Sequence, residues 1–237
     1  MRRLALILPF VALLGSSGCV QPGTTCDLDS SEIVLTTTAI DAEMSWRVEV
    51  VLERTGDVEE PLTICGEDDV LTINGADATE AVVYGVARNV ATLDASVETV
   101  EVEYSRSNGD VFVATVDTPP PFMITNPDAG AAVSRSMDTD VRWSPAGPEG
   151  TEMEVELRAD DVLCLEQWTE PVPDTGQFNL PAGEVTLGPS AMSEGTMECD
   201  ANLELTRSTI GEVEGSLASA SEIAAYRKRV QRIRSVP

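Results

Sequence analysis

The sequence of 237 residues contains no histidine and a single lysine, Lys228. Without histidine, neither a Ser-His-Asp nor a Cys-His catalytic site can form. With one lysine, Walker-type phosphate loops and Schiff-base chemistry are close to excluded. The patterns GxSxG, GxGxxG and HExxH are also missing. We therefore expect no enzymatic activity and no cofactor. The enzymatic alternative is a hydrolase with a pair of carboxylates, because 41 acidic residues supply many such pairs.

Basic residues are scarce as well. Removal of an N-terminal leader of 18 residues leaves 13 basic against 41 acidic residues, a net charge of −28. Such a surface repels nucleic acid, so we expect no nucleic-acid partner. Close-set acids near strand ends could bind calcium, although EF-hand spacing is missing and acidic loops commonly just face water. These acids are Asp27, Asp29, Asp68, Asp69, Asp138, Asp140, Asp160 and Asp161.

Only nine aromatic residues remain after the leader, and most fall at alternating strand positions typical of a core. Trp168 is the exception, in the segment "CLEQWTEPVPDTG" shortly after Cys164. Two interpretations stay open. Trp168 is either a recognition residue, for example for a glycan, or a core residue packed against a disulfide.

Long hydrophobic runs are missing at the N-terminus. The run "LALILPFVALL" (4–14) follows two arginines and has eleven residues, whereas a membrane-spanning helix needs about 20. A basic start, a short apolar run and then small residues predict a signal peptide over residues 1–18.

The segment "GSSGC" (15–19) resembles the lipobox of bacterial lipoproteins, with Ser16 where that family usually has leucine. The resemblance implies that Cys19 is lipidated, for example with palmitate, and becomes the mature N-terminus. Cleavage a little further on by ordinary signal peptidase is the alternative. Val20 follows the cysteine in place of an aspartate, which favours the outer over the inner membrane of the cell envelope.

The chain has five cysteines, and no two of them show CxxC or zinc-ligand spacing. If Cys19 carries lipid, four remain, and in an exported protein they predict two disulfides. Three connectivities are open. We favour Cys26–Cys65 with Cys164–Cys199, because each bridge then stays inside one predicted domain. Each should stabilise the fold by roughly 3–4 kcal/mol in the chain-entropy model.

The pattern beyond the leader is that of β-strands. Residues 32–40 are rich in β-branched types, and residues 46–54 alternate apolar with charged types. "VEVEY", "SNGD" and "VFVATV" predict a hairpin over 100–116, with Asn108-Gly109 as a two-residue type I′ turn. Residues 81–93 are ambiguous between strand and helix.

Three consecutive prolines interrupt the strand pattern at "TPPPF" (118–122), because proline has no backbone N–H to donate to a neighbouring strand. We place a domain boundary there. Beyond it, "EMEVELRAD" (152–160) predicts a strand with Met153, Val155 and Leu157 inward and its glutamates outward. The predicted organisation is a signal peptide (1–18), a tether (19–31), a first β-sandwich (32–118), a linker (119–121) and a second β-sandwich (122–237).

The segments "PFMITNPDAGAAVSRSMDTDVRWSPAG", "VELRAD", "DTGQFNLPAG" and "CDANLELTRS" resemble the immunoglobulin/fibronectin-like modules of bacterial exported lipoproteins. The likeness covers roughly residues 119–210, and a fainter version covers 32–118. It implies an all-β fold of two antiparallel immunoglobulin-like β-sandwich domains in tandem. It implies little chemistry, because these segments carry strands and turns and no catalytic residues.

The last stretch, 219–237, carries two conflicting signals. Ser219 and Glu222 fit a capping box, and apolar residues recur at helical spacing. The resemblance instead implies a strand that closes the second sandwich. We expect a compromise, a short helix from about Ser219 to Arg229 followed by an edge strand to Val236.

Together these features predict a lipid-anchored cell-envelope protein that acts as a non-catalytic binding or structural module. Its membrane contact would be the N-terminal lipid, and its partner an unknown protein or glycan. The alternatives are a calcium-stabilised adhesin and a hydrolase with an unrecognised carboxylate site.

Overall fold

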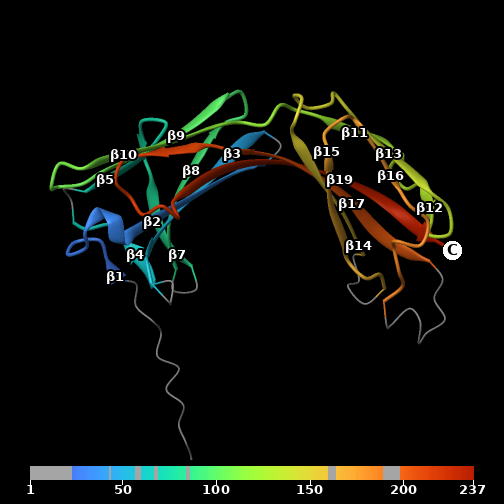
Figure 1. Cartoon of the computed structure of the whole chain (residues 1–237), viewed down its shortest axis with the longest axis horizontal. Coiled ribbons are helices and arrows are strands. Elements are labelled where there is room, and N and C mark those ends of the chain that lie inside the picture. Colours follow the sequence, from blue (N-terminus) through green and yellow to red (C-terminus); the bar gives the residue numbers. More distant parts are fainter. Residues whose placement is uncertain are drawn as a thin grey trace, which may run out of the picture.

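The computed structural model describes residues 23–42, 44–56, 60–66, 69–83, 86–159, 164–188 and 198–237. In these ranges the chain is all-β apart from one 3-10 helix, η1 (Ser30–Glu32). The strands form sheets of eleven, five and three strands. Two sandwich-like lobes stand side by side and together make an arch (Figure 1).

The first lobe packs part of the eleven-stranded sheet against the five-stranded sheet, whose order is β18-β10-β9-β5-β6. Its strands are β1 (Gly23–Thr24), β2 (Ile33–Asp41), β3 (Ser45–Arg54), β4 (Glu60–Thr63), β5 (Val70–Ile73), β6 (Ala76–Asp77), β7 (Thr79–Val83), β8 (Val86–Asp94), β9 (Thr99–Ser105), β10 (Val111–Asp117) and β18 (Glu212–Glu214).

The second lobe packs the other part of the eleven-stranded sheet against the three-stranded sheet, whose order is β11-β13-β16. Its strands are β11 (Met123–Asn126), β12 (Ala132–Ser134), β13 (Thr139–Ser144), β14 (Glu152–Ala159), β15 (Trp168–Pro173) and β16 (Gln177–Leu180).

Two long strands, β17 (Cys199–Ile210) and β19 (Glu222–Val236), connect the lobes (Figure 1). They pair antiparallel from Cys199↔Ser235 to Ile210↔Ala224. The start of β19 also pairs parallel with β2, and its end pairs parallel with β12. The eleven-stranded sheet is therefore continuous from one lobe to the other.

The predicted strand alternation is confirmed. In β14, Met153, Val155 and Leu157 are buried, while Glu152 and Glu154 are exposed. The hairpin of β9 and β10 is also present. The described residues of the ambiguous stretch, 81–83 and 86–93, belong to the strands β7 and β8, which pair with each other antiparallel.

The type I′ turn lies at a different Asn-Gly from the one predicted. Asn74 and Gly75 have φ values of 50° and 74° and connect β5 to β6 in a two-residue loop. At the predicted site only Gly109 has positive φ, because the Arg106 amide bonds to Asp110 and three residues form the loop. The prediction at Asn108-Gly109 was wrong in turn type, although the hairpin itself was right.

The predicted helix over Ser219–Arg229 is wrong, because residues 222–236 form one strand, and that strand is not an edge strand. Ile223 and Ala225 enter the first core, and Ile233 enters the second core. The pairing of β19 with β17 along its length, and with β2 and β12 at its two ends, satisfies most of its backbone groups, and this outweighs the local helical signals.

The chain division differs from the sequential one we predicted. Two separate hydrophobic cores are present, but β18 and the start of β19 complete the first lobe, although both lie beyond the prolines 119–121. The segment predicted as a tether also takes part, since β1 pairs with β4 and η1 packs on the first lobe.

Both predicted disulfides are present, Cys26–Cys65 in the first lobe and Cys164–Cys199 in the second. The first joins the segment that follows β1 to the segment that follows β4. The second joins the start of β17 to the segment before β15.

Ile223→Ala should destabilise the first lobe, although residue 223 lies far along the chain from the strands β1 to β10 of that lobe. Loss of a fully buried isoleucine should lower the free energy of unfolding by about 2–5 kcal/mol. Urea unfolding gives the size, and hydrogen exchange of β2 and β10 locates the effect. Val230→Ala on the same strand, where the side chain is 52% exposed, is the control and should change little. Faster exchange in the second lobe alone would contradict the shared strand.

Candidate interaction surface

A buried group of charged side chains joins the two lobes on the outer side of β17 and β19. Arg207 of β17 lies directly opposite Arg227 of β19. The Arg207 guanidinium donates to both carboxylate oxygens of Asp174, at 2.5 and 3.0 Å, and to the carbonyl oxygens of Pro120 and Pro145, both at 2.9 Å. One arginine therefore fixes the proline linker and a loop of the second lobe.

The neighbouring arginines fasten the first lobe to the same place. Asp41, at the end of β2, lies 2.9 Å from Arg229 Nη1 and 3.4 Å from Arg227 Nε. The Arg227 guanidinium also lies 4.9 Å from the ring centre of the buried Trp46. Burial lowers the pKa of Arg227, and the charge of Asp41 opposes that shift.

Phe122 completes this joint, with Arg207 at 4.8 Å and Arg229 at 5.9 Å from its ring centre. Its side chain is buried directly after the prolines. The joint is therefore packed from both lobes and from the linker, and we expect the arch to behave as one rigid body.

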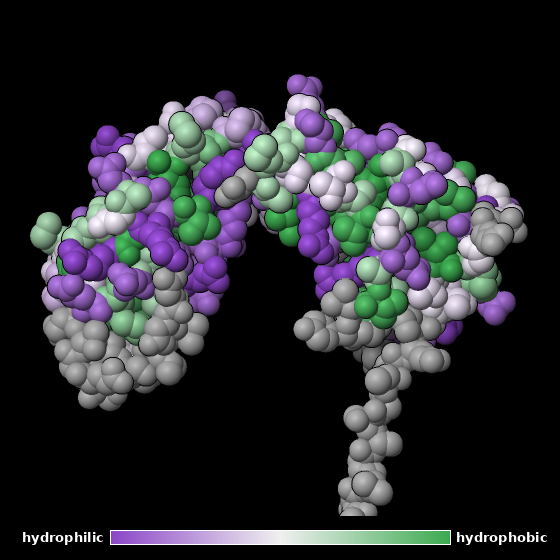
Figure 2. All heavy atoms as spheres, turned by 180° about the vertical axis from the view of Figure 1, so that it is seen from behind, coloured by the Kyte–Doolittle hydropathy of each residue, from purple (hydrophilic) through white to green (hydrophobic). Residues whose placement is uncertain are grey.

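The other side of the eleven-stranded sheet lines the hollow of the arch. The odd-numbered residues of β19, such as Ile223 and Ile233, point into the two cores, so the even-numbered ones point the opposite way. Figure 1 shows the two smaller sheets on the outer side of the arch. Figure 2 shows the hollow between the lobes, with hydrophilic side chains along both flanks. We call this surface the concave face.

An apolar group lies in the middle of the concave face, where the lobes meet. Tyr226 of β19 is directly opposite Ile40 of β2, and Ala224 is directly opposite Ile210 of β17. Ile210 is 80% exposed, Ile40 41% and Tyr226 37%. Residues on neighbouring strands at this register lie within side-chain reach of one another. We call Ile40, Ile210, Ala224 and Tyr226 the central patch.

Each flank of the concave face carries one glutamate between two cations. In the first lobe, Glu49 pairs with Arg47 at 2.8 Å and with Arg88 at 2.5 Å.

In the second lobe, the buried Glu204 pairs with Arg158, at 2.5 Å, and with Lys228. Each set, which we call a flanking triad, carries two positive charges and one negative charge. Close by, Arg232 makes no ion pair with any described residue.

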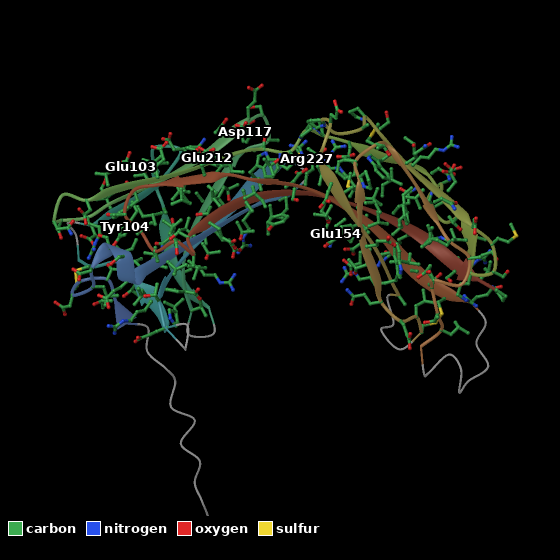
Figure 3. All side chains as sticks on the ribbon, in the orientation of Figure 1. Glu103, Tyr104, Asp117, Glu154, Glu212 and Arg227 are labelled. Atoms are coloured by element: carbon green, nitrogen blue, oxygen red, sulfur yellow. A yellow bond between two sulfur atoms is a disulfide. The ribbon has the colours of Figure 1, made fainter. Side chains whose placement is uncertain are left out.

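The outer face of the five-stranded sheet is different in charge. Its solvent-facing acids make no ion pair within the described part of the chain, and no basic side chain stands among them in the paired strands. Figure 3 labels three of them on the upper side of the arch, and Glu154 on the inner flank of the second lobe. These outer acids are Glu101, Glu103, Asp117, Glu212 and Glu214.

A buried polar network holds the N-terminal segment on the first lobe. The Tyr104 hydroxyl lies 3.0 Å from both Asp69 Oδ2 and Thr25 Oγ1. Arg106 donates to the carbonyl oxygens of Thr25, at 2.8 Å, and Leu28, at 2.9 Å. Burial raises the pKa of Tyr104 to about 12. The network and the Cys26–Cys65 disulfide together fix the segment that follows Gly23.

Asp69 is the charged centre of that network. Burial raises the pKa of its carboxyl, but hydrogen bonds from Ser107 and Tyr104 and the charge of Arg106 outweigh this, so the net pKa is lowered. The Ser107 amide donates to it at 2.7 Å.

Other sequence predictions fall in different places. Cys19, Asp68, Asp160 and Asp161 lie outside the described residues. No group of three or more acids and cysteines that could hold a metal occurs in the part of the chain that is described. There, Asp138 caps a turn at Ala182, and Asp140 pairs with Arg142.

Trp168 stacks on Phe178 with ring centres 6.0 Å apart and packs against the second core beside Cys164. This position fits the core interpretation.

The central patch was not predicted from the sequence. Tyr226 fits the helical spacing of apolar residues in the last stretch, whereas it projects from a strand onto the concave face. The missed signal was the alternation of buried odd-numbered residues in β19. The described chain contains no helix long and apolar enough to cross a membrane.

Comparison with known proteins gives few matches. No protein-family model matches the chain, and no curated protein matches it. Among solved structures, DIP-gamma IG1+IG2 is 10% identical with a TM-score of 0.23, covering 88% of this chain and 98% of that one. The complex of Dpr11 IG1 with DIP-gamma IG+IG2 gives 9% identity and a TM-score of 0.22, covering 86% and 95%. Our fold assignment rests on the sheets themselves.

Asp174→Asn should destabilise the protein strongly, because it leaves the buried Arg207 without its charged partner. Breaking such a buried pair costs about 3–5 kcal/mol. The matched control is Asp140→Asn, since the pair of Asp140 with Arg142 is exposed and should contribute only about 0–1 kcal/mol. Urea unfolding measures both, and equal losses would refute the role of the joint.

Asp69→Asn should remove an acid-sensitive part of the stability. Because the folded pKa of Asp69 is lowered, its contribution is present above the ordinary aspartate pKa and is lost as pH falls through the lowered value. The variant should therefore be less stable than the parent at pH 7, and the gap should shrink towards acid pH. Thermal unfolding between pH 7 and pH 3 tests this. A gap that widens on acidification would show that the sign is wrong. Glu103→Gln on the outer face is the control.

Proposed function

We propose that this protein is a lipid-anchored, non-catalytic binding module of the cell envelope, with the lipid on Cys19. The observation that carries the proposal is the continuous arch. One strand, β19, enters both cores, the joint around Arg207 packs the lobes together, and the concave face presents an uncovered apolar patch. A fixed hollow with an apolar centre and a charged surround has the composition of a protein-binding surface.

The N-terminal segment supports the anchoring part of the proposal. Cys19 precedes Gly23, the first residue of β1, by four positions, a reach of at most about 14 Å. The Cys26–Cys65 disulfide and the network around Asp69 then fix the segment to the first lobe. A lipid on Cys19 would hold this lobe close to the membrane, and Val20 favours the outer membrane.

Metabolic labelling with an alkynyl fatty acid should mark the parent protein and not Cys19→Ser, because the sulfur is the proposed attachment point. Cys26→Ser, which removes a disulfide cysteine instead, should remain labelled and controls for a general effect of cysteine loss. Density-gradient separation of the membranes then tests the preference for the outer one. Equal labelling of the parent and Cys19→Ser would refute the anchor.

A further inference from the structure

We propose that the concave face binds a partner protein through a convex surface that presents an apolar tip with carboxylates on both sides. The inference rests on the proposed function as a binding module and adds the face and the chemistry of the partner.

The central patch is the part of the concave face that would contact the apolar tip of the partner. On β2, β17 and β19 the concave side otherwise carries mostly threonine, serine and charged residues, as expected where a sheet faces water. Ile210, Ile40 and Tyr226 break that rule at adjacent register positions, where the two lobes meet. Tyrosine is enriched at the buried centres of protein interfaces.

The flanking triads provide the positive charges that would contact the carboxylates of the partner. Arg47 lies directly opposite Ile40 on β3, and Lys228 lies two residues beyond Tyr226 on the same side of β19. They stand on strands two apart in the sheet, about 10 Å across. Glu49 leaves one positive charge of Arg47 and Arg88 in excess, whereas Glu156 lies directly opposite Glu204 and adds a second negative charge there. Both triads nevertheless hold their cations in place, so carboxylates beside an apolar tip would find fixed partners.

The remaining surface argues against other occupants. A nucleic acid or other long polyanion would meet Glu152, Glu154 and Asp200 on the same face, in a chain whose formal net charge is −26. A second copy of this chain would bring a formal net charge of −26 against an equal charge, so a partner of different composition is favoured over a pair of this chain. Most of the exposed cations gather on the concave face, so a partner that bears acids meets the least repulsion there.

Photo-crosslinking tests the proposal in the full lipidated chain in intact cells. Benzoylphenylalanine replaces Tyr226 in one variant and Val111, 53% exposed on the outer face, in a matched control. We expect an adduct only from position 226, and mass spectrometry of the crosslinked peptide should find apolar residues flanked by Asp or Glu in a second protein. Adding Arg47→Glu with Lys228→Glu should lower the yield about tenfold, whereas Arg142→Glu should not.

The outcomes separate this inference from the function on which it rests. An adduct from position 111 and none from 226 would overturn the concave face and leave a binding module. Adducts from 226 to a basic segment, to a glycan or to a second copy of this chain would overturn the proposed chemistry. No adduct from either position would count against both.

Discussion

The unbroken hydrogen-bonded ladder between β17 and β19 is the constraint on which the rest of the structure depends. It runs from Cys199↔Ser235 in the second lobe to Ile210↔Ala224 in the first. Because the same two strands enter both lobes, no freely rotating linker separates the sandwiches. The hollow of the arch, the joint around Arg207 and the continuity of the concave face all follow from this ladder.

The ladder also fixes which side chains meet in the joint. Arg207 and Arg227 are direct neighbours and point to the same side. Two arginines side by side repel each other unless acids lie close, and Asp174 and Asp41 supply those acids from different lobes. Each lobe thus contributes a carboxylate to a cluster that neither could build alone.

Much of the fold could be predicted from period-two alternation. Strands such as β14 bury one face and expose the other, and this leaves a clear pattern in Met153, Val155 and Leu157. The number of disulfides followed from counting cysteines, and their pairing from keeping each bridge inside one predicted domain. The type I′ turn could not be placed, because two Asn-Gly pairs were available and only the register of the flanking strands distinguishes Asn74-Gly75 from Asn108-Gly109.

The strand at the C-terminus and the exposed central patch could not be predicted either, because both depend on pairing between strands that lie far apart in the chain. A helical spacing fits four apolar residues of this stretch, Ile223, Tyr226, Val230 and Ile233. Local signals cannot show that β2 and β17 pair with the segment on either side. Once the segment is a strand, Tyr226 and Val230 turn away from the cores. The exposure of the central patch is thus a consequence of long-range pairing.

The return of β19 to the first lobe has a consequence for how the protein is made. During synthesis from the N-terminus, the first lobe lacks Ile223 and Ala225 and the partner strand of β2 until these residues have emerged. Neither lobe is therefore complete until β19 has emerged, because the end of this strand carries Ile233 of the second core, and the chain cannot fold domain by domain in order of synthesis. A polypeptide that stays unfinished until its distant segments are present also stays open for longer after its first strands have been made.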